Sequence, residues 1–266
     1  MLGLRVGLIA LLCGLCVDAR AGLVVCADPN NLPFSNRQGA GFENRLAQVL
    51  AHELHTDVRY VWWAQRRGFA RNTLTQSGCD IWPGVASGIQ SMATSAPYYR
   101  STYVFVTRSA QPLEHLSLDD PRLRQLLIGV QLVGDDGTNT PPASALAQRG
   151  MTANVRGFTL YGDYRRPDPP TAILDAVRNG SVNVALVWGP LAGFYAKKSR
   201  TPLRIEPIPT DDKSPEPMSF DISVGVRRNE PQLLEQINRA LRATEPAIQR
   251  LLKTYGVPLI APGPPR

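Results

Sequence analysis

Short apolar runs alternate with amphipathic stretches along most of the chain. The runs are rich in β-branched residues and are bounded by turn-forming residues, which is typical of strands buried in a parallel sheet. The predicted strands are residues 23–27, 58–63, 80–85, 103–107, 128–133, 155–160, 182–187 and 220–226. Their alternation with helices predicts an α/β protein built on doubly wound sheets.

Helices are predicted between these strands. The clearest one begins at Phe42, because Leu46, Leu50 and Leu54 fall on one helical face. The others are residues 66–76, a short segment near 121, an Ala-rich helix capped by Thr140, residues 171–179, a helix capped by Asn229, and a last helix that ends at Gly256. Residues 202–217 are dense in proline, and we expect an irregular connection there.

The first residues differ from the rest of the chain. Arg5 precedes an apolar stretch at residues 6–17 that is too short to span a bilayer, and Ala19-Arg20-Ala21 has the small-x-small pattern of a signal-peptidase site. We therefore expect a signal peptide over residues 1–21 and export of the remainder. A short membrane anchor is the alternative, but the polar chain that follows favours cleavage.

Two cysteines, Cys26 and Cys79, remain after the signal peptide. An even pair in an oxidising compartment indicates one disulfide, and two buried free thiols are an alternative of equal weight.

The formal net charge of +7 suits an acidic protein partner or an anionic solute. Arg66, Arg67 and Arg71 form a basic patch on one predicted helix, which could grip a carboxylated quinone or an acidic protein surface. A solvated helix face is the simpler alternative. No basic helix alternates with stacking aromatic residues, which argues against nucleic acid as a partner.

The run at 182–187 stops at Trp188-Gly189-Pro190, two chain-turning residues after an indole. The carboxyl ends of strands in open α/β sheets face the ligand crevice. Trp188 could stack on a flat ligand, dock a partner or plug the crevice. A tryptophan that only packs in the core is an equal alternative.

Four stretches in order resemble the type II periplasmic solute-binding proteins of the amino-acid-binding kind. They are SAPYY at 95–99, IGVQ with the GDDGT loop at 128–138, the segment 176–187, and the segment 220–228. The resemblance implies two α/β lobes joined by two extended crossings. Lobe 1 would comprise 22–108 and 220–266, lobe 2 would comprise 109–219, and 261–266 would be a disordered tail.

Longer strings resemble one branch, the J proteins associated with quinoprotein alcohol dehydrogenases of methanol-oxidation systems. These strings are CADPNNLPFSN, WWAQRRGFARNTL, APYYRSTYVFV, GVQLVGDD, TPPASALAQRG and VWGPLAGF. The resemblance implies a periplasmic accessory protein that binds the dehydrogenase or aids its maturation. It implies no tightly bound cofactor and at most transient contact with pyrroloquinoline quinone (PQQ).

Both charged anchors of the amino-acid binders are replaced. Their carboxylate-binding Arg corresponds to the stretch Ser-Gly-Ile-Gln at 87–90, and Trp188 stands where they carry the Asp that holds the amine. A buried zwitterion without charge partners is costly to desolvate. We therefore expect that a free α-amino acid is not the ligand.

Twelve residues are candidates for the ligand or partner cleft. They are Asp28, Asn31, Phe34, Trp82, Tyr98, Tyr99, Asp135, Asp136, Asn139, Thr140, Tyr161 and Trp188. The loop at 134–140 leads into a predicted helix N-terminus, which favours anions. Asp135 and Asp136 weaken that interpretation, and we favour the alternative that they cap the loop and helix.

Two other functions compete with the accessory role. The first is an import receptor that delivers a small solute other than an amino acid to an ABC permease. The second is a dehydratase on the same scaffold, for which Glu43 and Asp163 are the nearest acid or base candidates and neither has an evident partner. His52 and His55 lack the spacing of a zinc hydrolase site, so we expect no catalytic residue and no metal site.

Overall fold

The computed structural model describes residues 22–66, 68–133, 138–159, 169–209, 214 and 216–261. The predicted signal peptide lies outside the described residues. So do Arg67, Asp135, Asp136, Tyr161, Asp163 and residues 262–266 of the predicted tail.

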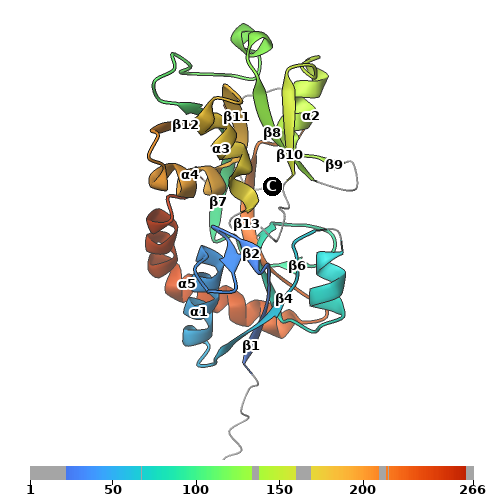
Figure 1. Cartoon of the computed structure of the whole chain (residues 1–266). Helices are drawn as coiled ribbons and strands as arrows, with labels where there is room; N and C mark the ends of the chain where they lie inside the picture. Colours follow the sequence, from blue (N-terminus) through green and yellow to red (C-terminus); the bar gives the residue numbers. More distant parts are fainter. Residues whose placement is uncertain are drawn as a thin grey trace, which may run out of the picture.

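One mixed sheet runs through the whole molecule in the order β10-β8-β11-β7-β13-β5-β1-β4 (Figure 1). These strands are β10 (Val155–Thr159), β8 (Ile128–Val133), β11 (Val184–Trp188), β7 (Tyr99–Arg108), β13 (Ser219–Val226), β5 (Ile81–Ala86), β1 (Leu23–Ala27) and β4 (Val58–Trp62). Short strands extend it: β12 (Leu203–Pro207) pairs with β7, β6 (Ala93–Thr94) with β13, and β9 (Thr138–Asn139) with β8. Strands β2 (Asn30–Asn31) and β3 (Ser35–Asn36) form a separate hairpin.

The long strand β7 joins two lobes. Its first residues, Tyr99 to Thr102, pair antiparallel with β13, and its last residues, Tyr103 to Thr107, pair antiparallel with β11. Tyr99 is buried in one hydrophobic core, whereas Phe105 is buried in another. The two strands β7 and β13 are therefore the crossings that the sequence predicted. The lobe boundaries at 108/109 and 219/220 stay a prediction.

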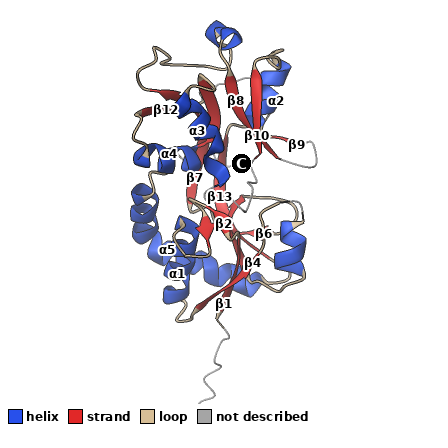
Figure 2. Cartoon of the chain, viewed as in Figure 1, coloured by secondary structure: helices blue, strands red, loops and turns tan. Residues whose placement is uncertain are grey.

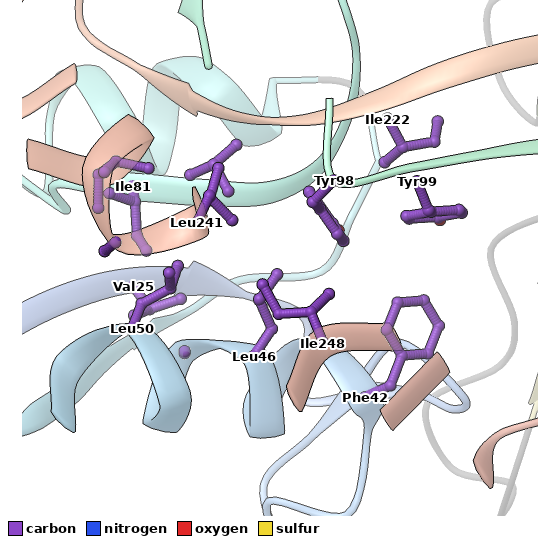
Figure 3. Packing of buried hydrophobic residues seen from close by; sticks show 14 of the residues in the cluster. Val25, Phe42, Leu46, Leu50, Ile81, Tyr98, Tyr99, Ile222, Leu241 and Ile248 are labelled. Atoms are coloured by element: carbon purple, nitrogen blue, oxygen red, sulfur yellow. The ribbon is translucent and has the colours of Figure 1, made fainter. Parts of the chain in front are cut away.

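The core of the first lobe lies between the sheet and two helices, α1 (Phe42–Glu53) and α5 (Pro231–Thr254). Leu46 and Leu50 of α1 and Ile248 of α5 pack against Val25 and Ile81 of the sheet (Figure 3). The periodic apolar face that predicted a helix from Phe42 is the face that is buried.

A disulfide joins Cys26 at the end of β1 to Cys79 just before β5, with the two Cα atoms 5.5 Å apart. Of the two alternatives left open by the sequence, the structure has the bonded pair. The disulfide lies in a small core with Phe69 and Val85.

In the second lobe, helices flank the strands on both sides (Figure 2). They are α2 (Pro141–Gln148), α3 (Ala172–Asn179) and α4 (Gly189–Lys198), with short helical turns η2 (Pro121–Gln125) and η4 (Pro169–Thr171). Thr140 precedes α2 as predicted, but its hydroxyl does not cap the helix, since Oγ1 donates instead to the carbonyl of Gln131 at 2.6 Å.

Several sequence predictions are wrong. The sheet is mixed, because β7, β12 and β13 run antiparallel to their neighbours. The proline-dense connection contains β12, which pairs with β7 at the edge of the second lobe. Gly189-Pro190 does not turn the chain but begins α4, since proline is well suited to the first turn of a helix.

Helix α5 replaces the two helices predicted at the end of the chain. Pro246 lies inside it and removes one backbone hydrogen-bond donor. Ile237, Leu241 and Ile248 are nevertheless buried on one continuous face, so packing against the first lobe outweighs the local cost. Arg66 also lies outside the predicted helix, because the helical segment there is reduced to a turn and η1 (Arg71–Thr75).

Candidate functional site

A cavity of about 290 Å³ lies between the lobes. Its described wall contains Asn31, Phe34, Glu43, Gln65, Gly84, Ala86, Tyr103, Gln131, Pro170, Trp188, Leu191, Phe220 and Ile222. Both lobes and both crossing strands contribute to this wall. The volume is at the lower end of the range for small-molecule sites.

Three of the twelve predicted cleft residues, Asn31, Phe34 and Trp188, line this cavity. Asp28 lies directly behind the wall and is buried. Its Oδ1 accepts from the Asn30 N–H at 2.7 Å, and its Oδ2 accepts from the Gln65 N–H at 2.6 Å. Asp28 therefore holds Gln65 in place, and the Asn31 amide donates to Gln65 Oε1 at 3.0 Å.

Trp82, Tyr98, Tyr99, Asn139 and Thr140 are not among the described lining residues. The Trp82 ring packs on Phe69, with ring centroids 4.6 Å apart, because Trp82 points toward the disulfide side of β5. Asn139 is exposed and Thr140 is buried beneath the wall. The sequence placed these residues in or next to the correct loops and strands. It did not show toward which side each side chain points.

Tyr98 and Tyr99 belong to the core of the first lobe, where their rings lie above Phe42 and beside Ile222 (Figure 3). They form a second layer behind the cavity. The Tyr98 hydroxyl is buried and makes no hydrogen bond of regular geometry, although the Gly84 backbone is close enough to oppose the rise of its pKa. Burial raises the pKa of the Tyr99 hydroxyl, the charge of Glu43 raises it further, and a hydrogen bond from Trp188 opposes the rise.

Trp188 combines a packing role with a place in the cavity wall. Its backbone N–H donates to Gln131 Oε1 at 3.2 Å, which fixes that side chain in the wall. Its ring meets Tyr103 edge-on with centroids 5.2 Å apart and Phe220 with centroids 6.0 Å apart. We call Phe34, Tyr103, Trp188 and Phe220 the aromatic wall.

The chain passes very close to itself beside Trp188. A Cβ atom on Gly189 would lie 2.6 Å from the Thr102 carbonyl oxygen on β7. Only glycine permits this approach, which seats α4 and the end of β11 against the crossing strand.

Glu43 faces the cavity from the first turn of α1. Its N–H donates to the Phe34 carbonyl at 2.9 Å, so the two residues are placed together. Burial, with the nearby charge of Asp28 as the second cause, raises the pKa of the Glu43 carboxyl from 4.5 to about 8. The carboxyl is therefore protonated at neutral pH when the cavity holds only solvent.

Gly84 makes room for this carboxyl. Its φ is +80°, and a Cβ atom there would lie 2.1 Å from Glu43 Oε1. No hydrogen bond to the Glu43 carboxyl occurs among the described residues, which leaves it available to a bound molecule.

None of the described lining residues is Lys, Arg or His. Arg66 and Arg71 of the predicted basic patch are exposed and do not line the cavity. The described wall thus combines carboxyl and amide groups with aromatic rings.

Four cavity residues were not predicted from the sequence: Gln65, Gln131, Tyr103 and Phe220. Glu43 was predicted only as a candidate catalytic acid or base. A signal for Tyr103 and Phe220 was present, because the resemblance placed both crossing segments at the cleft. Gln131 also had a signal, since it ends the IGVQ stretch that carries the resemblance, whereas the placement of Gln65 depends on its contact with Asp28.

No protein-family model matches the chain. A protein named MoxJ from Methylorubrum extorquens is 32% identical over 251 residues, covering 90% of this chain and 81% of that protein. A MoxJ from Paracoccus denitrificans is 30% identical over 257 residues, covering 90% of this chain and 89% of that protein. The chain belongs to the MoxJ family.

Solved structures agree with membership of the MoxJ family. The periplasmic binding protein XoxJ from Methylobacterium extorquens AM1 superimposes with a TM-score of 0.74 at 36% identity, covering 90% of this chain and all of that one. MxaJ from Methlophaga aminisulfidivorans MPT gives a TM-score of 0.75 at 27% identity, with the same coverage. An ancestral cationic amino-acid solute-binding protein, at 20% identity and a TM-score of 0.67, shares the fold.

These comparisons confirm the predicted two-lobed type II binding-protein fold and the predicted branch. Across the described parts of the chain, no helix has the length and apolar character needed to cross a membrane.

Proposed function

We propose that this MoxJ-family chain is a periplasmic, non-catalytic accessory protein of a PQQ-dependent alcohol dehydrogenase of the methanol type. It binds the dehydrogenase or aids its maturation. The observation that carries the proposal is the match to MoxJ proteins over 90% of the chain, together with the long strings that resemble the J proteins of methanol oxidation. The predicted signal peptide supports export to the same compartment.

The altered cleft supports a role other than amino-acid capture. Trp188 ends β11 where the amino-acid binders carry the Asp for the ligand amine. Residues 87–90, where they carry the Arg for the ligand carboxylate, form an exposed turn without Arg. A zwitterionic ligand would enter this cavity without either counter-charge.

The cavity also favours binding of the dehydrogenase over carriage of its cofactor. PQQ is a carboxylated quinone, and the described wall holds the Glu43 carboxyl with Asp28 behind it and no basic side chain. Carboxylates that leave water without a basic partner are costly to bury. We therefore expect contact with PQQ to be transient and to take place in the complex with the dehydrogenase.

The test is affinity capture from periplasmic extract with the mature, tagged chain as bait. We expect the quinoprotein dehydrogenase to be enriched relative to a tagged amino-acid-binding protein of the same fold, and alcohol oxidation to fall when the gene is deleted. No enrichment together with unchanged alcohol oxidation would overturn the proposal.

A second candidate is a substrate-binding component of an ABC importer, which the retained interlobe cavity favours. Ligand capture raises apparent stability by mass action, so a solute that shifts the melting temperature and is also taken up in a gene-dependent way would support import. The third candidate, a dehydratase, has the least support, because Glu43 has no hydrogen-bond partner among the described residues to act with.

A further inference from the structure

The cavity combines three features that act on the same ligand. Glu43 presents a carboxyl without a hydrogen-bond partner among the described residues, the aromatic wall contributes four aromatic side chains, and Leu191 and Ile222 add apolar surface. The Glu43 carboxyl and the Trp188 side chain both act on the Tyr99 hydroxyl, the first through its charge and the second through a hydrogen bond. The charged and aromatic groups are therefore within reach of one small molecule.

The electrostatics of the described wall select the charge of that molecule. An anion would meet the negative charge of Asp28 behind the wall, with no basic side chain among the described lining residues to offset it. A neutral apolar molecule would leave the Glu43 carboxyl desolvated and unpaired, which is costly. A cation would pair with the carboxylate and be attracted by the negative faces of the aromatic rings.

We propose that this cavity binds a small organic monocation, of the alkylammonium or quaternary ammonium class, with Glu43 as its counter-ion and the aromatic wall as its cage. The cavity of about 290 Å³ has room for roughly ten water molecules, so the ligand has few heavy atoms. The inference is independent of the dehydrogenase association, because it concerns the cavity and not a protein surface.

Binding of the cation is coupled to release of a proton. The groups that face Glu43 are Asp28, from the loop after β1, and Tyr98 and Tyr99, at the start of β7. Burial and the charge of Asp28 both favour the protonated form of the Glu43 carboxyl. A bound cation would favour the ionised form instead. Affinity for a permanent cation should therefore rise as the pH rises toward the Glu43 pKa of about 8.

The experiment is isothermal titration calorimetry of the mature chain with choline and tetramethylammonium. The matched neutral probe is 3,3-dimethylbutan-1-ol, which replaces the quaternary nitrogen of choline by carbon, and pivalate is the anionic probe. We expect choline to bind at least about tenfold more tightly than its neutral isostere, since the difference is the charge pairing. Equal affinities, or tighter binding of pivalate, would overturn the proposal.

Variants identify the groups responsible. E43Q keeps the size of the side chain and should weaken choline binding by about tenfold or more, and W188L should weaken it by a similar factor. E53Q is the control, because Glu53 is exposed at the far end of α1. Thermal unfolding checks that each variant is folded, and unchanged affinity in a folded E43Q would refute Glu43 as the counter-ion.

The pH dependence gives an independent readout. For tetramethylammonium the dissociation constant should fall by roughly fiftyfold between pH 6 and pH 8, with nearly one proton released per ion at pH 7. Proton release is measured by titration in buffers of different ionisation enthalpy. A pH-independent dissociation constant in the wild type would contradict the coupling.

The proposed function is tested separately by capture of the dehydrogenase with the E43Q variant. This variant should still bind the enzyme, because the proposed cation site does not take part in that association.

Discussion

The two sides of the interlobe cavity are built in different ways. On the carboxyl side, Asp28, Asn31 and Gln65 come from loops of the first lobe and are held by hydrogen bonds to one another. On the other side, Tyr103, Trp188 and Phe220 come from three strands far apart in the sequence and are held by ring packing. The first arrangement depends on local turns and a disulfide, whereas the second depends on the crossing of β7 and β13.

The difference shows which groups of the cavity are held by hydrogen bonds and which are available to a bound molecule. The Asp28 carboxylate accepts hydrogen bonds from the backbone N–H groups of Asn30 and Gln65, and it thereby holds these residues in place. Glu43 is left unsatisfied between the two sides, at the point where a ligand would meet both. A change at Glu43 alters the chemistry of the cavity, whereas a change at Trp188 alters both that chemistry and the ring packing with Tyr103 and Phe220.

The largest effect is expected on the carboxyl side, from removal of the disulfide. Replacing both Cys26 and Cys79 by Ala should lower the free energy of unfolding by about 2–4 kcal/mol, since the closed loop of the unfolded chain is long. Urea unfolding of the variant and of the oxidised wild type measures the difference. Equal midpoints would show that the loops around Asp28 do not need the cross-link.

The aromatic side is tested by Gly189→Ala. The added Cβ would lie 2.6 Å from the Thr102 carbonyl, so the backbone must shift, at a cost of about 1–3 kcal/mol. Gly150→Ala is the reference for backbone strain alone and should cost about 1 kcal/mol, because its φ is +70° and no atom lies within 4 Å of the added carbon. Thermal unfolding measures the loss of stability in each variant. If Gly189→Ala loses no more stability than Gly150→Ala, the close approach of α4 to β7 does not stabilise the crossing strand.

Glu43 is tested through the pH dependence of stability. Its folded pKa of about 8 is above the ordinary value, so its stabilising contribution is complete below about pH 4.5 and is lost as the pH rises through 8. The E43Q variant has no carboxyl at this position, so it does not lose this stability as the pH rises. Its stability relative to wild type should therefore rise between pH 5 and pH 8, by on the order of 1–2 kcal/mol once screening by solvent in the cavity is allowed for. A constant difference across this range would contradict the raised pKa.

The smallest effect is expected behind the carboxyl side, at Tyr98. Its hydroxyl is buried and makes no hydrogen bond of regular geometry, so Tyr98→Phe should change the free energy of unfolding by less than about 1 kcal/mol or should stabilise the protein slightly. Chemical denaturation measures it. A loss well above that value would reveal a hydrogen bond to the hydroxyl in solution.

Much of the fold was predictable from sequence because its signals are local. The buried face of α1, the strand β8 and the helix α2 after Thr140 follow from hydrophobic spacing and from turn residues. Where the signals conflicted, tertiary packing decided. Two helices were predicted at the end of the chain, but the apolar face on both sides of Pro246 is buried against the first lobe and α5 is continuous.

The sequence by itself determined most of the strands and helices in their order and the family, since these follow from local periodicity and from motifs along the chain, and it predicted the loss of both amino-acid anchors. Only the tertiary structure decided that Cys26 bonds Cys79, that Trp188 meets Tyr103 and Phe220, and that Glu43 lies unpaired in the cavity. The physical reason is that periodicity reports which face of an element is buried, whereas the pKa of a carboxyl depends on what the other segments place against it.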